Sequence, residues 1–227
     1  MFYFVIIGVF SLVGMLVGNR LKSKFRHYSQ KPITGNMSGA DIARQMLSHY
    51  GISDVKIQQG QGFLSDHYNP MTKIVSLSPE VFQGRNISAA AVAAHECGHA
   101  VQHANAYNML QLRSGLVPVM KVSSRIQQFL FMGMMIGMGA GMGGNLFLLV
   151  LMATFGITAL FSLITLPVEF DASRRALAWL DNSGVTQGEQ YDGAKDALWW
   201  AAMTYVVSAL SALVVFLYFF LQFMGRD

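Results

Sequence analysis

The chain has 227 residues, of which 53% are hydrophobic and only 12% are charged, about half the charged share of a soluble globular domain. This composition excludes an ordinary soluble protein and predicts a mainly α-helical integral membrane protein. The net charge of +4 does not indicate a nucleic-acid partner, because the basic residues flank apolar segments and do not form an aromatic-rich patch. Cys97 is the one cysteine, which excludes an intrachain disulfide framework.

The chain opens with an apolar segment, residues 1–18, and its first basic residues come after that segment. A secretory signal peptide carries its positive charge before the apolar segment and a cleavage site after it. The order found here therefore predicts an uncleaved transmembrane helix over 1–19, with the N-terminus outside.

Residues 20–127 have an ordinary composition and are predicted to form a small α+β domain in the cytosol. Ser38 is expected to cap a helix over 39–50, which Gly51 ends. Ser88 is expected to cap an alanine-rich helix over 89–108. Between these helices the turn signals predict three short strands, at 55–58, 63–67 and 73–77.

A second apolar stretch, about twice the ~20 residues that one helical span needs, begins after residue 127. Gly143-Gly144-Asn145 interrupts it, which predicts transmembrane helices over 128–144 and 146–167. A fourth span is predicted over 201–224, and residues 168–200 then form a second cytosolic segment.

The distribution of positive charge sets the orientation. If the N-terminus lies outside and there are four spans, Arg226 is the one residue among the 16 Lys and Arg that falls on the outer side. Basic residues near span ends are retained in the cytoplasm, so this asymmetry predicts that 20–127 and 168–200 lie there.

The chemistry-bearing motif is His95-Glu96-Cys97-Gly98-His99, an HExxH sequence within the predicted 89–108 helix. Residues four apart share a helix face, so His95 and His99 can direct ring nitrogens at one zinc ion. Glu96 is not expected to bind the metal. It is placed to take a proton from an activated water and pass it on, as a general base does in peptide hydrolysis.

A catalytic zinc site needs a third protein ligand. His103 is excluded, because it lies eight residues past His95, about 12 Å along a helix axis. Two acidic residues at the end of the 146–167 span remain, Glu169 and Asp171, and such residues are costly there unless they have a function or a partner. We predict Glu169 as the ligand, because Asp171 has arginine partners three and four residues on.

These motifs resemble the YugP-type family of bacterial membrane zinc metallopeptidases. The resemblance covers nearly the whole chain, including the segments Asp66-His67-Tyr68-Asn69-Pro70, Ala94–Ala100 and Leu166–Ser173. A more distant resemblance is to HtpX-type gluzincins, in which an Asp four residues after the Glu ligand supports a zinc-binding His. Here Ser173 occupies that position.

The resemblance implies a zincin-like (gluzincin) domain with one catalytic Zn²⁺, located in the bacterial inner membrane with a cytoplasmic active site. It implies peptide or protein substrates, membrane proteins among them, held against a strand such as 73–77. Asp171 is a candidate for supporting the site. His67 and Tyr68 are candidates for stabilising an oxyanion, with a turn role as the alternative.

Two other functions remain to be weighed. A protease with its HExxH inside the bilayer is disfavoured, because the 87–110 stretch is too polar to face lipid. The second alternative is a membrane scaffold or transporter with a non-catalytic metal site. Structural zinc sites normally use four protein ligands, and the sequence offers three.

Overall fold

The computed structural model describes residues 2–135 and 145–225, which contain seven helices and one three-stranded sheet. The chain divides into two compact units. One unit comprises Met1–Leu16, Gln111–Leu166 and Thr204–Asp227, and the other comprises Val17–Leu110 and Pro167–Met203. The candidate metal ligands all belong to the second unit.

Three helices in the described residues are long and apolar enough to cross a membrane: α1 (Phe2–Ser29), α6 (Asn145–Asn182) and α7 (Glu189–Met224). They have 28, 38 and 36 residues, whereas a span needs ~20. Each helix therefore extends beyond its predicted span, and its polar end belongs to the second unit. The predicted span 128–144 lies mostly outside the described residues, and α5 (Asn108–Met135) contains its first part.

Within the first unit, α5 is joined to α6 by polar contacts. Ser123 Oγ donates to the carbonyl oxygen of Thr154 at 3.0 Å, and Gln127 Nε2 donates to Thr158 Oγ1 at 3.1 Å. A small apolar cluster that includes Leu151, Phe155 and Phe219 links α6 to α7. Interhelical hydrogen bonds of this kind hold helices together where burial of apolar surface from water contributes little.

In the second unit, α2 (Gly39–His49) confirms the prediction for its segment. Ser38 Oγ accepts from the backbone N–H of Asp41 at 3.2 Å, and the Asp41 carboxylate accepts from the Ser38 N–H, which completes a capping box. Gly51 follows the helix with a φ of +68°, a conformation that glycine adopts without strain.

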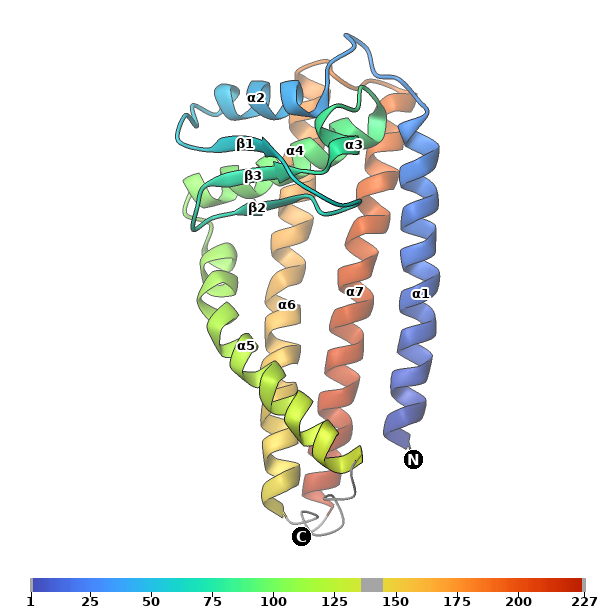
Figure 1. Cartoon of the computed structure of the whole chain (residues 1–227), viewed down its shortest axis with the longest axis vertical. Helices are drawn as coiled ribbons and strands as arrows, with labels where there is room; N and C mark the ends of the chain where they lie inside the picture. The colour runs from blue at the N-terminus through green and yellow to red at the C-terminus, as the bar shows by residue number, and fades with distance from the viewer. Residues whose placement is uncertain (1, 136–144, 226–227) are drawn as a thin grey trace. The chain divides into compact units, whose positions relative to one another are not determined.

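The sheet consists of β1 (Lys56–Gln59), β2 (His67–Asn69) and β3 (Ile74–Leu77) in the order β1-β3-β2 (Figure 1). β3 pairs in parallel with β1 and antiparallel with β2. Two of the predicted strands are close to those observed, but the one at 63–67 is wrong, since only His67 is in a strand. Gly62 and Leu64 have φ values of +89° and +55°, so the preceding segment forms a turn.

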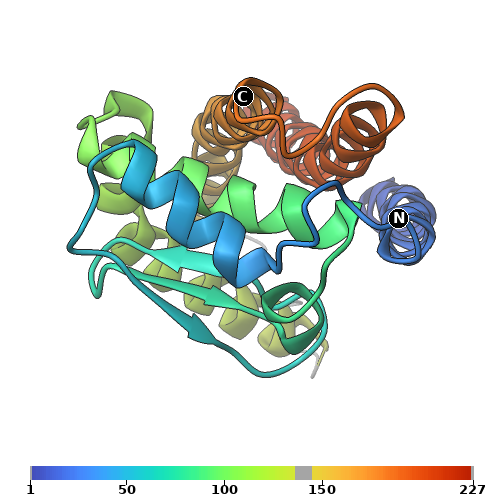
Figure 2. The same cartoon turned by 90° about the horizontal axis from the view of Figure 1, so that it is seen from above.

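α4 (Ile87–Ala104) packs beside α2, and both helices contact the sheet (Figure 2). The predicted cap of this helix is also wrong. Asn86 caps it, with Oδ1 accepting from the N–H of Ala89 at 2.9 Å. Ser88 lies inside the helix, where its hydroxyl donates to the carbonyl oxygen of Phe25 at 2.7 Å. The short helix α3 (Pro79–Phe82) precedes it, and α4 ends before the predicted residue 108.

α6 continues without interruption through Pro167, where the sequence predicts the end of a span and the start of a separate segment. Proline lacks an N–H and usually ends or kinks a helix. Here the residues that follow Pro167 remain helical, and one face of this part of α6, with Val168, Ala172 and Ala176, is buried. This continuation carries Glu169 alongside α4.

Candidate metal centre

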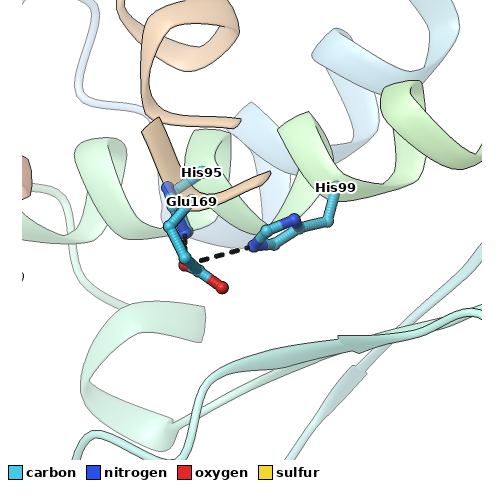
Figure 3. Close-up of side chains that lie close together, drawn as sticks. All are labelled: His95, His99 and Glu169. Carbon is cyan, nitrogen blue, oxygen red and sulfur yellow. Dashed lines mark ion pairs between the residues drawn. The ribbon is translucent and has the colours of Figure 1, made fainter. Parts of the chain in front are cut away.

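Two helices bring together three side chains that could bind a metal ion: α4 supplies His95 and His99, and α6 supplies Glu169 (Figure 3). Glu169 Oε2 lies 3.3 Å from His95 Nε2 and 3.6 Å from His99 Nε2. All three side chains are largely buried, and Glu169 is 2% exposed. The two histidines and the glutamate that the sequence predicts as ligands therefore form one cluster.

The position of Glu169 depends on a close approach of the two helices at Gly98. A Cβ atom at this position would lie 2.6 Å from the carbonyl oxygen of Ala172, nearer than real Cβ contacts allow. Glycine lets the α6 backbone rest directly on α4 between the two histidines. The HExxH segment thus supplies both the ligands and the space that the third ligand's helix occupies.

The geometry of the cluster fits a metal ion. Two ligands bound to zinc at ~2.0–2.2 Å in a tetrahedral arrangement lie roughly 3.4 Å apart. The two distances to Glu169 Oε2 are close to this value, and the three ligand atoms all lie within 4.8 Å of one another. Two imidazoles and one carboxylate form a donor set typical of catalytic zinc, with a fourth position left for a non-protein ligand.

Each histidine is held by a hydrogen bond at its other ring nitrogen. Ser173 Oγ lies 3.1 Å from Nδ1 of His95. Gln102 Oε1 lies 3.0 Å from Nδ1 of His99. Both contacts leave the Nε2 atoms directed at the cluster, which is how metal-binding histidines are usually oriented.

The contact between Gln102 and His99 also fixes the imidazole tautomer. Gln102 is fully buried, and its Nε2 donates to the carbonyl oxygen of Val168 at 2.8 Å and to Asp171 Oδ2 at 2.9 Å. These two bonds from Nε2 turn Oε1 toward His99, and because an amide oxygen can only accept, Nδ1 of His99 carries the hydrogen. His99 Nε2 is then left with its lone pair available for a metal.

Asp171 does not belong to the ligand cluster and is held by cations instead. It accepts from Arg175 Nε at 2.6 Å and is also bonded to Arg174. Its contact with Gln102 makes it the end of a chain that runs from Asp171 through Gln102 to His99. Asp171 therefore lies where the sequence places a supporting residue, but an amide separates it from the imidazole.

Negative charge and burial shift the proton affinities near the cluster. Burial lowers the pKa of His99. The hydrogen bond to Glu169 and the negative charge of Glu169 raise it by more, so the pKa of His99 lies above its usual value. The pKa of Asp66 is also raised, mainly because the carboxyl group is buried. The hydrogen bond from the Ser78 N–H lowers this pKa, and the negative charge of Glu96 raises it. Glu96 is 8% exposed, and its charge acts on both of these residues.

Comparison with known proteins shows the family to which the chain belongs. The profile of the family described as "Putative neutral zinc metallopeptidase" matches residues 3–224. The chain belongs to this family. It is also 39% identical over 210 residues to the "Putative membrane protease YugP" of Bacillus subtilis (strain 168), covering 92% of this chain and 91% of that protein. No solved structure matches the chain.

The remaining candidate residues lie in contacts of their own. His67 is exposed, and its Nδ1 lies 2.9 Å from the carbonyl oxygen of Ser65. The Tyr68 hydroxyl lies 2.7 Å from Nδ1 of His103, and burial raises the pKa of Tyr68 to about 12. Cys97 is buried beside the carbonyl oxygen of Ala43, and burial raises the pKa of its thiol, which makes it an unreactive core residue.

Two polar residues of the site were not assigned a role from the sequence: Gln102 and Ser173. A signal for each exists, because Gln102 lies three residues after His99 and Ser173 lies four after Glu169. Both therefore share a helix face with a ligand. The Ser173 hydroxyl contacts His95 from the position four residues after Glu169.

Proposed function

We propose that this chain is a membrane-anchored zinc endopeptidase, with one zinc ion held by His95, His99 and Glu169. The observation that carries the proposal is the cluster of three largely buried candidate ligand atoms, contributed by helices far apart in the sequence. When bound there, zinc would act as a Lewis acid on the peptide carbonyl and lower the pKa of water. Family membership supports the choice of metal and of reaction.

The protein's own residues have separate tasks in the proposed mechanism. Glu96 is the general base: it takes a proton from the attacking water and delivers it to the leaving amine nitrogen. Ser173 and Gln102 keep His95 and His99 in the orientation that presents Nε2. Burial of the cluster limits competing water and strengthens the electrostatic contacts within it.

The sheet suggests where an extended substrate would lie. β3 is hydrogen-bonded on both sides, so the expectation that residues 73–77 hold the substrate is corrected. β2 is an edge strand of this sheet and contacts α4, and the Glu169 carboxylate points from α6 toward the side where the sheet lies (Figure 3). We propose that the substrate backbone pairs with the free edge of β2, as in other strand additions.

The proposed location is a bacterial inner membrane, with four spans and the active site in the cytoplasm. Three candidate spans are present in the described residues, and the similar protein from Bacillus subtilis is described as a membrane protease. The alternative of a scaffold or transporter is disfavoured, because a structural zinc site would use four protein ligands and this cluster has three.

The substitution Glu96→Gln tests the proposal. The variant should keep its zinc, because Glu96 is not in the ligand cluster, and its hydrolysis of unfolded casein should fall by ~10²–10⁴-fold. Glu80→Gln, at an exposed glutamate of α3, is the matched control and should keep parental activity. Casein hydrolysis by Glu96→Gln at the parental rate, or by the parent stripped of metal with a chelator, would refute the mechanism.

A further inference from the structure

A cavity of about 550 Å³ lies between α6 and α7 within the unit that contains the metal centre. The two helices run side by side here (Figure 2). None of the three candidate metal ligands lines the cavity, and the proposed hydrolysis does not use its volume. Along α7 its wall changes from apolar, at Ala202 and Trp199, to charged, at Lys195 and Asp192, whereas on α6 the apolar Leu177 and Ala178 follow Arg174.

The apolar part of the wall contains two large exposed side chains. Phe170 is 38% exposed and Trp199 is 54% exposed, and Leu198 and Ala202 lie beside them. Phe170 lies directly after the apolar stretch of α6, and Trp199 lies at the beginning of the apolar stretch of α7. Aromatic residues at such transitions are typical of the interface between membrane and water, so in the proposed membrane arrangement the apolar part lies at the level of lipid headgroups.

In the charged part of the wall, one positive and one negative side chain have no ion-pair or hydrogen-bond partner among the described residues. Asp192 and Lys195 are exposed and one turn apart on α7, and neither side chain forms an ion pair or hydrogen bond with any described residue. The other charges of the wall are engaged. Arg174 is paired with Asp171, and Asp196 lies 2.6 Å from Lys24 Nζ and accepts from the Tyr28 hydroxyl at 2.8 Å.

These groups match the parts of one kind of molecule. A phosphate suits the ammonium group of Lys195, a primary ammonium suits the carboxylate of Asp192, and an acyl ester region suits the surface of Phe170 and Trp199. We propose that the cavity binds the headgroup of a zwitterionic phospholipid that carries a primary ammonium. This inference does not depend on the proposed peptidase activity.

The cavity shares a residue with the metal centre. Ser173 lines the cavity, and its hydroxyl lies 3.1 Å from Nδ1 of His95. A bound headgroup therefore contacts a residue that orients a metal ligand.

Native mass spectrometry of the full chain in detergent tests the proposal. The protein is mixed with equal amounts of phosphatidylethanolamine, phosphatidylcholine and phosphatidylglycerol with identical acyl chains. Phosphatidylethanolamine should be retained about tenfold more than the other two lipids. Phosphatidylcholine and phosphatidylglycerol have no N–H group, so neither can form the charge-assisted N–H hydrogen bond to Asp192. Trp199→Ala should reduce retention of all three lipids alike.

The paired substitution Asp192→Asn with Lys195→Gln should remove the preference for phosphatidylethanolamine. The control variant, Asp54→Asn with Lys73→Gln, changes an exposed ion pair of the same unit in the same way. It should keep the preference for phosphatidylethanolamine. Equal retention of the three lipids by the parent, a preference for phosphatidylglycerol, or an unchanged preference in the Asp192 and Lys195 variant would overturn the proposal. Displacement of the lipid by equimolar soluble phosphoethanolamine would do so too, because it would show a site for a free headgroup compound.

Discussion

Two carboxylates of α6, Glu169 and Asp171, lie only two residues apart but have different surroundings. Glu169 faces two imidazole nitrogens and is 2% exposed, whereas Asp171 faces two guanidinium groups and the Gln102 amide. Positions two apart on a helix point about 200° away from each other, so one helix cannot present both to a single ion. The arginine partners hold Asp171 away from the metal position.

The first prediction separates the roles of these carboxylates. Glu169→Ala should lower zinc content far below one ion per chain, because it removes one of three ligands. Asp171→Ala should keep most of its zinc, with weaker affinity. Metal analysis of the two purified variants decides the assignment, and zinc retained without Glu169 but lost without Asp171 would reverse it.

The second prediction concerns Gln102, whose amide links Asp171 to His99. Gln102→Leu should weaken zinc binding by ~10–100-fold, the usual cost of losing a hydrogen-bond partner behind a metal ligand. It should also alter the visible spectrum of the Co²⁺-substituted protein, because the His99 ring loses the hydrogen bond that orients it and raises its basicity. Gln58→Leu, at an exposed strand position, is the control. A parental zinc affinity in Gln102→Leu would show that the amide does not position the ligand.

The sequence was sufficient to predict the three side chains that form the candidate cluster, but not the residues that contact them. The spacing of His95 and His99 indicates shared ligation by itself, and Glu169 is preferred to Asp171 because Asp171 has arginine partners three and four residues on. The roles of Gln102 and Ser173 depend on how α4 and α6 cross. The place where α4 and α6 cross depends on the packing of Gly98 against Ala172. The pattern of residues along a single helix does not show which residue of another helix packs against it.

At the scale of the elements, the contact between α4 and α6 is the feature on which the metal centre depends. The third prediction is that Gly98→Ala separates the two helices, because the added methyl group overlaps the Ala172 carbonyl oxygen. Overpacking of this kind costs about 1–3 kcal/mol of stability and should reduce zinc content as Glu169 moves away. Thermal unfolding and metal analysis measure the two effects.

Gly115→Ala provides the matched control for that substitution. Gly115 is in the interior of α5, and a Cβ atom there would have no neighbour within 4 Å. This variant should keep its zinc and be at least as stable as the parent, because alanine is favoured over glycine in a helix interior. Full zinc content and parental stability in Gly98→Ala would show that the close approach is not required.

The elements predicted correctly from the sequence are those with strong local signals. The capping box of Ser38 and Asp41 is complete within four residues, and α2 begins where it predicts. The strand predicted at 63–67 fails because Leu64 adopts a left-handed conformation, which its residue type does not signal. Ser88 fails as a cap because its hydroxyl bonds Phe25, a residue 63 positions away, while Asn86 caps the helix.

At the scale of the whole molecule, the apolar stretches predicted the long helices but not their full length. α1, α6 and α7 all continue past the last apolar residues into the unit that contains the metal centre. Their polar ends are stabilised by contacts such as the ion pair of Lys24 with Asp196, which hydropathy does not predict. The candidate metal centre is thus built partly from extensions of helices that can cross a membrane.

The fourth prediction concerns the arrangement in the membrane, which the distribution of charge indicates. A single cysteine at Gly143, in a Cys97→Ala background, should react with a membrane-impermeant maleimide in intact cells, because the hairpin is predicted to lie outside. A cysteine at Gln187, between α6 and α7, should react only after the membrane is opened. Gln187 is preferred to its neighbour Gly188, whose φ of +54° would strain a cysteine.

The two positions test different parts of the same topology. Fifteen of the 16 Lys and Arg residues lie on the predicted inner side, and reversing the orientation would place them outside against the usual bias. Both cysteines must become equally reactive after permeabilisation, which controls for exposure of the thiol. Labelling of the Gln187 position in intact cells would place the α6–α7 connection outside and contradict a cytoplasmic active site, because Glu169 and this connection belong to the same compact unit.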